Sequence, residues 1–179
     1  MPILTGPQVI SELRRQLQNQ SGRHLYVVLG LYSQLEAFEK IDLTPAQTAD
    51  GQAFPELVNF NRELLACIED EALRHMVRDE SRRPQAVESQ LNQAFDQILR
   101  RCFEQHSFLI LKQCELMFAY KLDVSKLRTY AANQNHLLLI LPGRQVSHQI
   151  QLFHEAEPRF QAQFPGQLVT ENNLWELKA

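Results

Sequence analysis

The chain has 179 residues, of which 44% are hydrophobic and 22% charged, and this composition predicts one globular domain over 1–179 rather than a disordered chain. Its formal net charge of −3 excludes nucleic-acid binding driven by the charge of the whole protein. The longest apolar runs, such as 137–141, are too short to span a bilayer, and no secretory pattern stands at the N-terminus.

The N-terminal part of the chain predicts a helix followed by a buried strand. Thr5 and Gln8 have the spacing of a capping box, in which each side chain bonds the other residue's backbone amide. Apolar residues then recur with helical spacing up to about residue 17. The continuous apolar run 25–29, ended by Gly30, is typical of a strand that is buried on both faces.

The middle of the chain predicts a loop, a short strand and two helices. The segment 42–55 is rich in polar residues, glycine and proline and is expected to be a surface loop. A short strand is expected at 57–60. Apolar residues with helical spacing then predict one helix over 64–77 and a second over 87–102, separated near 81–84.

Two further apolar runs, 108–111 and 137–141, predict central strands, with a mostly helical segment between them. Pro142 and Gly143 are expected to end the second strand, and a helix is expected over about 145–153. Two weak edge-strand candidates follow, at 168–169 and 174–177.

Continuously apolar strands that alternate with helices predict an α/β fold, a three-layer sandwich with a mainly parallel sheet. Ligands of such sheets bind beyond the carboxyl ends of the strands. The candidate site is therefore expected at four segments: Gly30 onward, 59–62, 112–115 and 142–144.

A buried strand that ends in glycine and leads into a helix is where the phosphate-binding loop of P-loop NTPases lies, and that loop needs the pattern G-x-x-x-x-G-K-[ST]. After Gly30, the second glycine position holds Leu35 and the lysine position holds Glu36. Ala37 replaces the hydroxyl residue that would hold Mg²⁺, and Lys112 stands where a metal-binding acidic residue is expected. The sequence thus predicts a P-loop NTPase-like core with a degenerate site that binds no nucleotide cofactor.

Other chemistry finds little support in the sequence. Glu115 is better placed to favour a helix dipole than to bind a metal, and the six histidines show no metal-binding spacing. No nucleophile motif occurs, so no catalytic residue, no metal site and no enzymatic activity are expected. Cys67, Cys102 and Cys114 form no CxxC pair, which predicts free thiols and a cytoplasmic location.

The order of these features resembles the small P-loop protein of BREX phage-defence systems, the BrxF-like family. The segments that carry the resemblance are 25–30, 57–65, 108–118, 127–143 and 157–160. The resemblance implies a degenerate member without the P-loop lysine. Such a member would be a non-catalytic adaptor subunit of a prokaryotic antiviral complex, bound to a larger protein.

The expected partner surface surrounds the former nucleotide site and the helix that ends near residue 101. Exposed apolar groups anchor interfaces, and arginines add charge complementarity. The candidates are Leu31, Tyr32, Leu35, Arg82, Arg83, Arg100 and Arg101. Two alternatives stay open: an ATP-binding regulatory domain with a non-standard site, and a small DNA-binding module that uses its arginine doublets. No membrane partner is expected.

Overall fold

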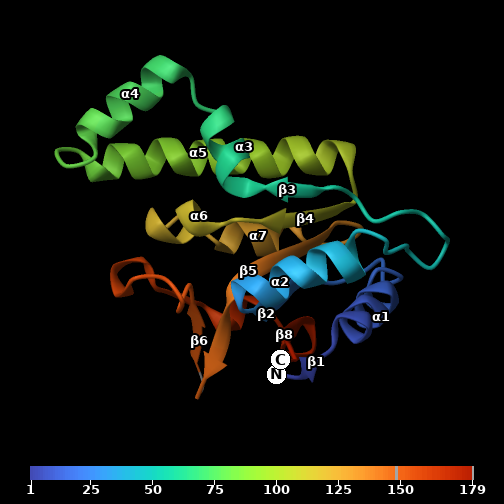
Figure 1. Ribbon diagram of the computed structural model, residues 1–179. Helices are drawn as coiled ribbons and strands as arrows, with labels where there is room; N and C mark the ends of the chain where they lie inside the picture. Colours follow the sequence, from blue (N-terminus) through green and yellow to red (C-terminus); the bar gives the residue numbers. More distant parts are fainter. Residues whose placement is uncertain (148, 179) are drawn as a thin grey trace.

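The computed structural model describes residues 1–147 and 149–178, and its centre is one sheet with helices on both faces (Figure 1). Six strands make the parallel part of this sheet: β1 (Ile3–Leu4), β2 (Leu25–Gly30), β3 (Leu57–Asn59), β4 (Phe108–Lys112), β5 (His136–Val146) and β8 (Leu174–Leu177). Their order across the sheet is β1-β8-β2-β5-β4-β3, and every neighbouring pair is parallel. The predicted α/β class with a mainly parallel sheet is confirmed.

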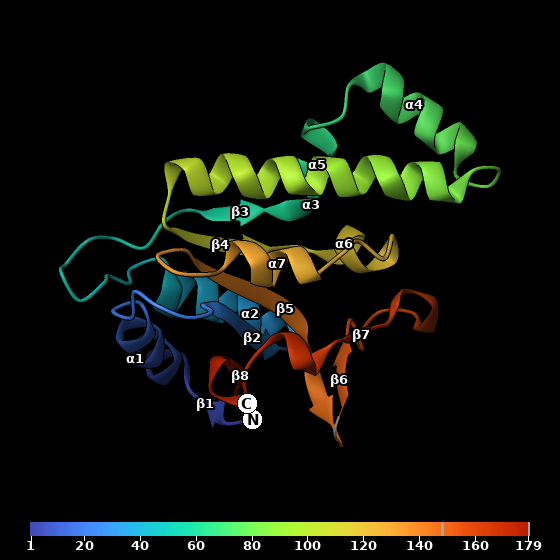
Figure 2. The same ribbon diagram turned by 180° about the vertical axis from the view of Figure 1, so that it is seen from behind.

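Helices form a layer on each face of the sheet (Figure 2). One face is covered by α1 (Gly6–Gln16), α2 (Tyr32–Phe38) and the π-helical turn η1 (Glu39–Leu43) that continues α2. The other face is covered by α3 (Phe60–Ala66), α4 (Asp70–Asp79), α5 (Pro84–Gln105), α6 (Glu115–Ala119) and α7 (Ser125–Tyr130). This arrangement agrees with the predicted three-layer sandwich. Among the helices of residues 1–147 and 149–178, none combines the length and apolar character that a bilayer span requires.

The core consists of two apolar clusters, one on each face of the sheet. Successive side chains of a strand point to opposite faces, so Val27 and Leu29 join the larger cluster, whereas Tyr26 and Val28 join the smaller one. Trp175 of β8 also belongs to the smaller cluster and stacks on Tyr26 with ring centroids 5.9 Å apart. The continuous apolar runs in the sequence therefore reflect burial on both sides.

Several helix predictions are confirmed, with one correction. The side-chain oxygen of Gln8 accepts a hydrogen bond from the backbone amide of Thr5 at 2.9 Å, so α1 begins as expected. The segment 64–77 was expected to be one helix, but α3 ends at Ala66 and α4 begins at Asp70. The second predicted helix is present as α5.

The prediction of a helix over 145–153 is wrong. β5 continues through Pro142 and Gly143 and pairs in antiparallel fashion with β6 (Gln149–Leu152), which pairs in turn with β7 (Ala162–Phe164). Pro142 does not end the strand because it lies at the last parallel pair, and its carbonyl accepts a hydrogen bond from the Phe153 amide at 2.8 Å. The Pro-Gly signal therefore marks a change of partner strand within β5.

The C-terminal strand predictions also need correction. Residues 168–169 are not a strand, because 3₁₀ turns occupy this stretch: η2 (Pro158–Phe160), η3 (Gly166–Leu168) and η4 (Glu171–Asn173). Residues 174–177 do form a strand, but β8 lies inside the sheet between β1 and β2 rather than at its edge.

Replacing Gly143 by alanine should destabilise the protein, because a Cβ there would lie 2.7 Å from the backbone carbonyl oxygen of Gln151. Overpacking of this kind costs about 1–3 kcal/mol. Urea denaturation of Gly143→Ala should show this loss. Gly166→Ala is the control, since its Cβ would come no closer than 3.7 Å to Ile150, and equal stabilities of the two variants would contradict the prediction.

Candidate functional site

The carboxyl ends of β2, β3 and β4 meet at one edge of the sheet, where parallel α/β sheets bind their ligands. We define the carboxyl edge as residues 30–32, 59–61 and 112–115 together with Glu39 and Glu155, which contact them. Three of the four segments predicted from the sequence lie here. The fourth, 142–144, begins here, since Pro142 pairs with Gly30, and then continues into the antiparallel part of β5.

The passage from β2 to α2 contains no phosphate-binding loop. Gly30 ends β2, Leu31 is the N-cap, and α2 begins at Tyr32. The side-chain oxygen of Gln34 accepts a hydrogen bond from the Leu31 amide at 2.8 Å and so satisfies this helix start. A P-loop needs several residues between strand and helix to wrap a phosphate, and a single residue leaves no room for that cradle.

The predicted loop positions 35–37 lie inside α2. Leu35 is only 4% exposed and packs in the smaller core cluster, so its predicted role as an exposed partner contact is wrong. The physical reason is the helical spacing of Leu35 and Phe38, which places both on the face of α2 that covers the sheet. Glu36 and Ala37 face away from the sheet, and Glu36 forms an exposed ion pair with Lys40 at 2.7 Å.

Lys112 ends β4 and takes part in an ion pair across the carboxyl edge. Its Nζ lies 2.6 Å from Oε2 of Glu39, and both side chains are largely buried, at 29% and 20% exposure. The pair therefore links the end of β4 to η1. At the end of β4 the Lys112 ammonium is thus neutralised by a carboxylate of the protein itself.

Amide side chains cross-link the end of β3 and the start of α3 to the segment that leads from β4 into α6. Asn61 Nδ2 donates to Oε2 of Glu115 at 2.8 Å, and Asn61 Oδ1 accepts from the backbone amide of Leu116 at 3.0 Å. Asn59 bonds in the same way to the side chain of Gln113, a residue with a left-handed backbone at φ 53°. These contacts join the segments that follow β3 and β4.

The exposed part of the carboxyl edge is aromatic and acidic. Tyr32 is 43% exposed, and its backbone amide donates to Oε2 of Glu155 at 2.9 Å. Burial raises the pKa of the Tyr32 phenol, and the nearby carboxylates of Glu115 and Glu155 raise it further. Carboxylates repel phosphate groups and attract cations, so this surface favours a basic ligand over a nucleotide.

The predicted arginines do not form one surface with this edge. Arg82 and Arg83 lie in the turn between α4 and α5, whereas Arg100 and Arg101 lie near the end of α5, about 25 Å away at 1.5 Å per residue. Arg100 pairs with Asp96 at 3.2 Å and Arg101 pairs with Glu63 at 2.9 Å. Half of the predicted charged contacts are thus engaged within the protein.

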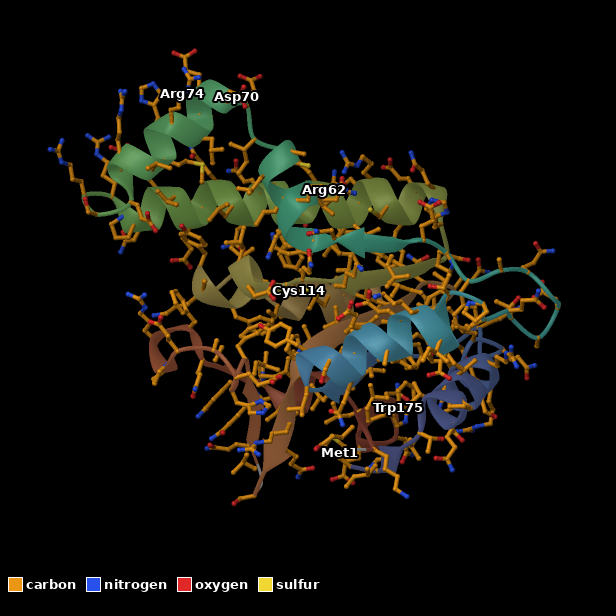
Figure 3. All side chains as sticks on the ribbon, in the orientation of Figure 1. Met1, Arg62, Asp70, Arg74, Cys114 and Trp175 are labelled. Atoms are coloured by element: carbon orange, nitrogen blue, oxygen red, sulfur yellow. The ribbon has the colours of Figure 1, made fainter. Side chains whose placement is uncertain are left out.

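Thiol and metal chemistry gain no support from the geometry. Cys114, labelled in Figure 3, is fully buried, and burial raises the pKa of its thiol far above the usual range. Burial likewise raises the pKa of Cys102. In the part of the chain that the structure describes, no three His, Cys, Asp or Glu side chains are placed to share a metal ion.

Sequence reasoning missed a buried polar cluster at the opposite edge of the sheet. The Tyr26 hydroxyl lies 3.3 Å from Nδ1 of His24 and 3.1 Å from Nδ1 of His136, and the two imidazole rings stack with centroids 4.3 Å apart. A signal did exist: a histidine precedes each of the two longest apolar runs. Pairing of Leu25 with Leu137 then places those histidines side by side.

Comparison with protein-family models found no match, and neither did comparisons with curated proteins and with solved structures.

Proposed function

We propose that this chain is a non-catalytic interaction subunit that docks its carboxyl edge onto a larger protein. The observation that carries the proposal is the direct passage from β2 into α2 through the single residue Leu31. That passage removes the phosphate cradle but retains the strand ends that would surround one. Gly30 and Lys112 still lie at the same edge, on strands separated only by β5.

The exposed groups of the carboxyl edge favour a basic segment as the docking partner. Leu31 and Tyr32 are 36% and 43% exposed at the start of α2, and aromatic residues of this kind anchor interfaces. The carboxylates of Glu115 and Glu155 lie close to the Tyr32 phenol. An arginine or lysine can lie over an aromatic ring and pair with a carboxylate at the same time.

The resemblance to the BrxF-like family supplies a setting for this proposal. In that setting the core derives from a P-loop NTPase, and the partner is another subunit of a prokaryotic phage-defence complex. The two alternative functions, an ATP-binding regulatory domain and a small DNA-binding module, have less physical support. Carboxylates at the edge oppose ATP binding, and Arg100 and Arg101, one of the arginine doublets that a DNA-binding module would use, are paired with acidic neighbours.

Tyr32→Ala should weaken binding to the native partner by about tenfold or more, because the substitution removes the central aromatic group of the proposed interface. The partner is recovered from the native host with tagged wild-type protein, and its affinity for each purified variant is then measured by calorimetry. Ile41→Ser is the matched control, since Ile41 is 70% exposed and, unlike Glu39 of the same turn, is not one of the residues of the carboxyl edge.

Two outcomes would contradict the proposal. Wild-type protein that brings down no partner would argue against an adaptor role altogether. A Tyr32→Ala variant that stays folded and binds as tightly as the Ile41→Ser control would show that the interface lies elsewhere.

A further inference from the structure

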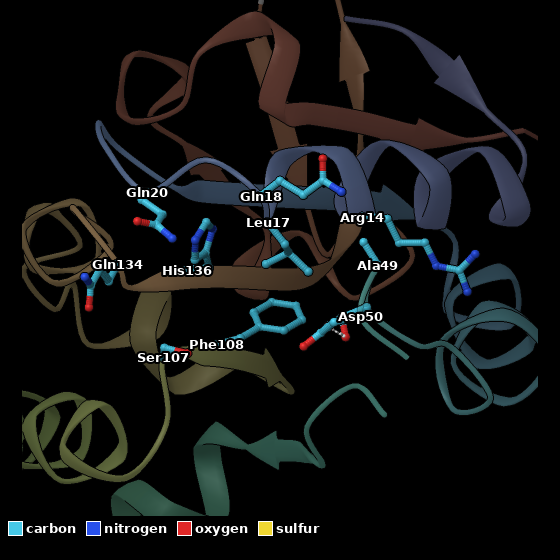
Figure 4. Close-up of a pocket in the computed structure, with 11 residues that line it drawn as sticks. Arg14, Leu17, Gln18, Gln20, Ala49, Asp50, Ser107, Phe108, Gln134 and His136 are labelled. Carbon is cyan, nitrogen blue, oxygen red and sulfur yellow. Dashed lines mark hydrogen bonds between the residues drawn. The ribbon is translucent and has the colours of Figure 1, made fainter. Parts of the chain in front are cut away.

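A cavity of about 720 Å³ opens at the amino ends of β4 and β5, on the side of the sheet opposite to the carboxyl edge (Figure 4). This volume is within the range of about 300–1,000 Å³ that is typical of small-molecule sites. Gln20, Gln134 and His136 gather at one end of the cavity, and Arg14 and Asp50 lie at the other. The side chains of Leu17 and Phe108 form its middle part.

The polar groups of this cavity are exposed and make few contacts within the protein. Among residues 1–147 and 149–178, no hydrogen-bond partner is found for the side-chain amides of Gln20 and Gln134. Arg14 donates through Nε to the carbonyl oxygen of Gln47 at 2.5 Å. Asp50 accepts a hydrogen bond from the hydroxyl of Thr48. Within the same residues, neither charged group forms an ion pair.

Each part of the cavity matches a different part of a nucleoside. A side-chain amide presents a donor beside an acceptor, and this pattern complements the edge of a nucleobase. Phe108 lines the middle of the cavity with the 9% of its surface that its edge-to-face packing on Phe54 leaves exposed, and this apolar patch can contact a base. A carboxylate such as Asp50 accepts hydrogen bonds from ribose hydroxyls. Because Arg14 and Asp50 offset each other, the cavity favours a ligand without net charge.

His136 fixes the base end of the cavity by its buried contacts. Its side chain is only 5% exposed and is held by the Tyr26 hydroxyl and by stacking on His24. The single hydroxyl proton of Tyr26 can be donated to one imidazole only, so the other histidine must carry its proton on Nδ1 and donate to the phenol oxygen. The cluster is therefore a fixed support for a ligand rather than a mobile side chain.

We infer that the cavity at the amino ends of β4 and β5 binds a neutral nucleoside, with the base between Phe108 and the amides of Gln20 and Gln134. The ribose hydroxyls lie toward Asp50. This site is separate from the carboxyl edge, so it does not depend on the proposed docking function. The proposed ligand is a free nucleoside. A nucleic-acid strand carries the same bases, so the experiment must distinguish a strand from a free nucleoside.

The test is calorimetric titration of the full chain with adenosine, guanosine, cytidine and uridine, with ribose, a nucleoside monophosphate and a single-stranded oligonucleotide as comparison ligands. At least one nucleoside should bind, and ribose alone should not. The double variant Gln20→Leu, Gln134→Leu should bind that nucleoside about tenfold more weakly or worse, because both amide edges are lost. Gln85→Leu, on the exposed start of α5, should bind like wild type.

A second readout locates the ligand. The imidazole NMR signals of His136 should move on titration, whereas those of the exposed His106 should not. Circular dichroism shows whether the double variant is folded. If it is not folded, the shift of the His136 signals in the wild-type protein is the test of where the nucleoside binds. The inference is overturned if no nucleoside binds at millimolar concentration, if binding leaves His136 unmoved, or if the oligonucleotide binds much more tightly than any nucleoside.

Discussion

Restoring the residues of a phosphate-binding loop, by Leu35→Gly, Glu36→Lys and Ala37→Thr together, should strongly destabilise the protein rather than create nucleotide binding. Leu35 is 4% exposed in the core between α2 and the sheet. Removing a buried leucine side chain costs about 2–5 kcal/mol, and glycine within a helix costs about 1 kcal/mol more than alanine. The sum is a large part of the 5–15 kcal/mol that typically stabilises a domain.

Urea denaturation followed by circular dichroism measures this loss, and a thermal shift with ATP and Mg²⁺ measures nucleotide binding. Glu36→Lys alone is the control. Glu36 is 68% exposed and only its surface ion pair with Lys40 is lost, so this variant should stay within about 1 kcal/mol of wild type. A triple variant that is as stable as wild type and gains an ATP-dependent shift would show that α2 can rearrange into a loop.

The sequence was informative wherever burial alone decides the structure. The apolar runs 25–29, 108–111 and 137–141 correctly predicted β2, β4 and β5, because a strand buried on both faces must be continuously apolar. Position in the sheet was harder to predict. The segment 174–177 is a weak edge-strand candidate in the sequence, but its insertion between β1 and β2 depends on pairing partners, and β2 is distant in the sequence.

The sequence predicted which strand ends meet at the carboxyl edge, but it did not predict how the chain passes from β2 into α2. The carboxyl edge was located correctly from Gly30 and Lys112, since strand ends follow from strand assignments. The form of its loop did not follow from the P-loop pattern, because that pattern fixes spacings from Gly30 and carries no information on where the next helix begins. Leu35 and Phe38, with helical spacing, and Gln34 as a capping side chain were the available signs that residues 32–38 form a helix.

Acidification should destabilise the protein through the buried cluster of His24, Tyr26 and His136. Burial and, to a smaller extent, the neighbouring His24 lower the pKa of His136 to about 4, and burial also lowers the pKa of His24. In the unfolded chain a histidine has a pKa of about 6.5. Between about pH 6.5 and about pH 4, the unfolded chain therefore binds protons that the folded protein does not, and the free energy of unfolding falls as the pH falls.

For His136 alone the loss over this range is about 2–3 kcal/mol, at about 1.4 kcal/mol per pH unit of pKa difference, and it should not grow below about pH 4. His136→Gln cannot titrate and keeps a polar group beside the Tyr26 hydroxyl. Between about pH 7 and about pH 4.5 this variant should therefore lose less stability in urea denaturation than wild type does. His106→Gln, at an exposed position, should lose as much as wild type. Equal losses in all three proteins would mean that the buried imidazoles do not govern acid stability, and that the carboxylates, whose protonation is common to all three, account for it.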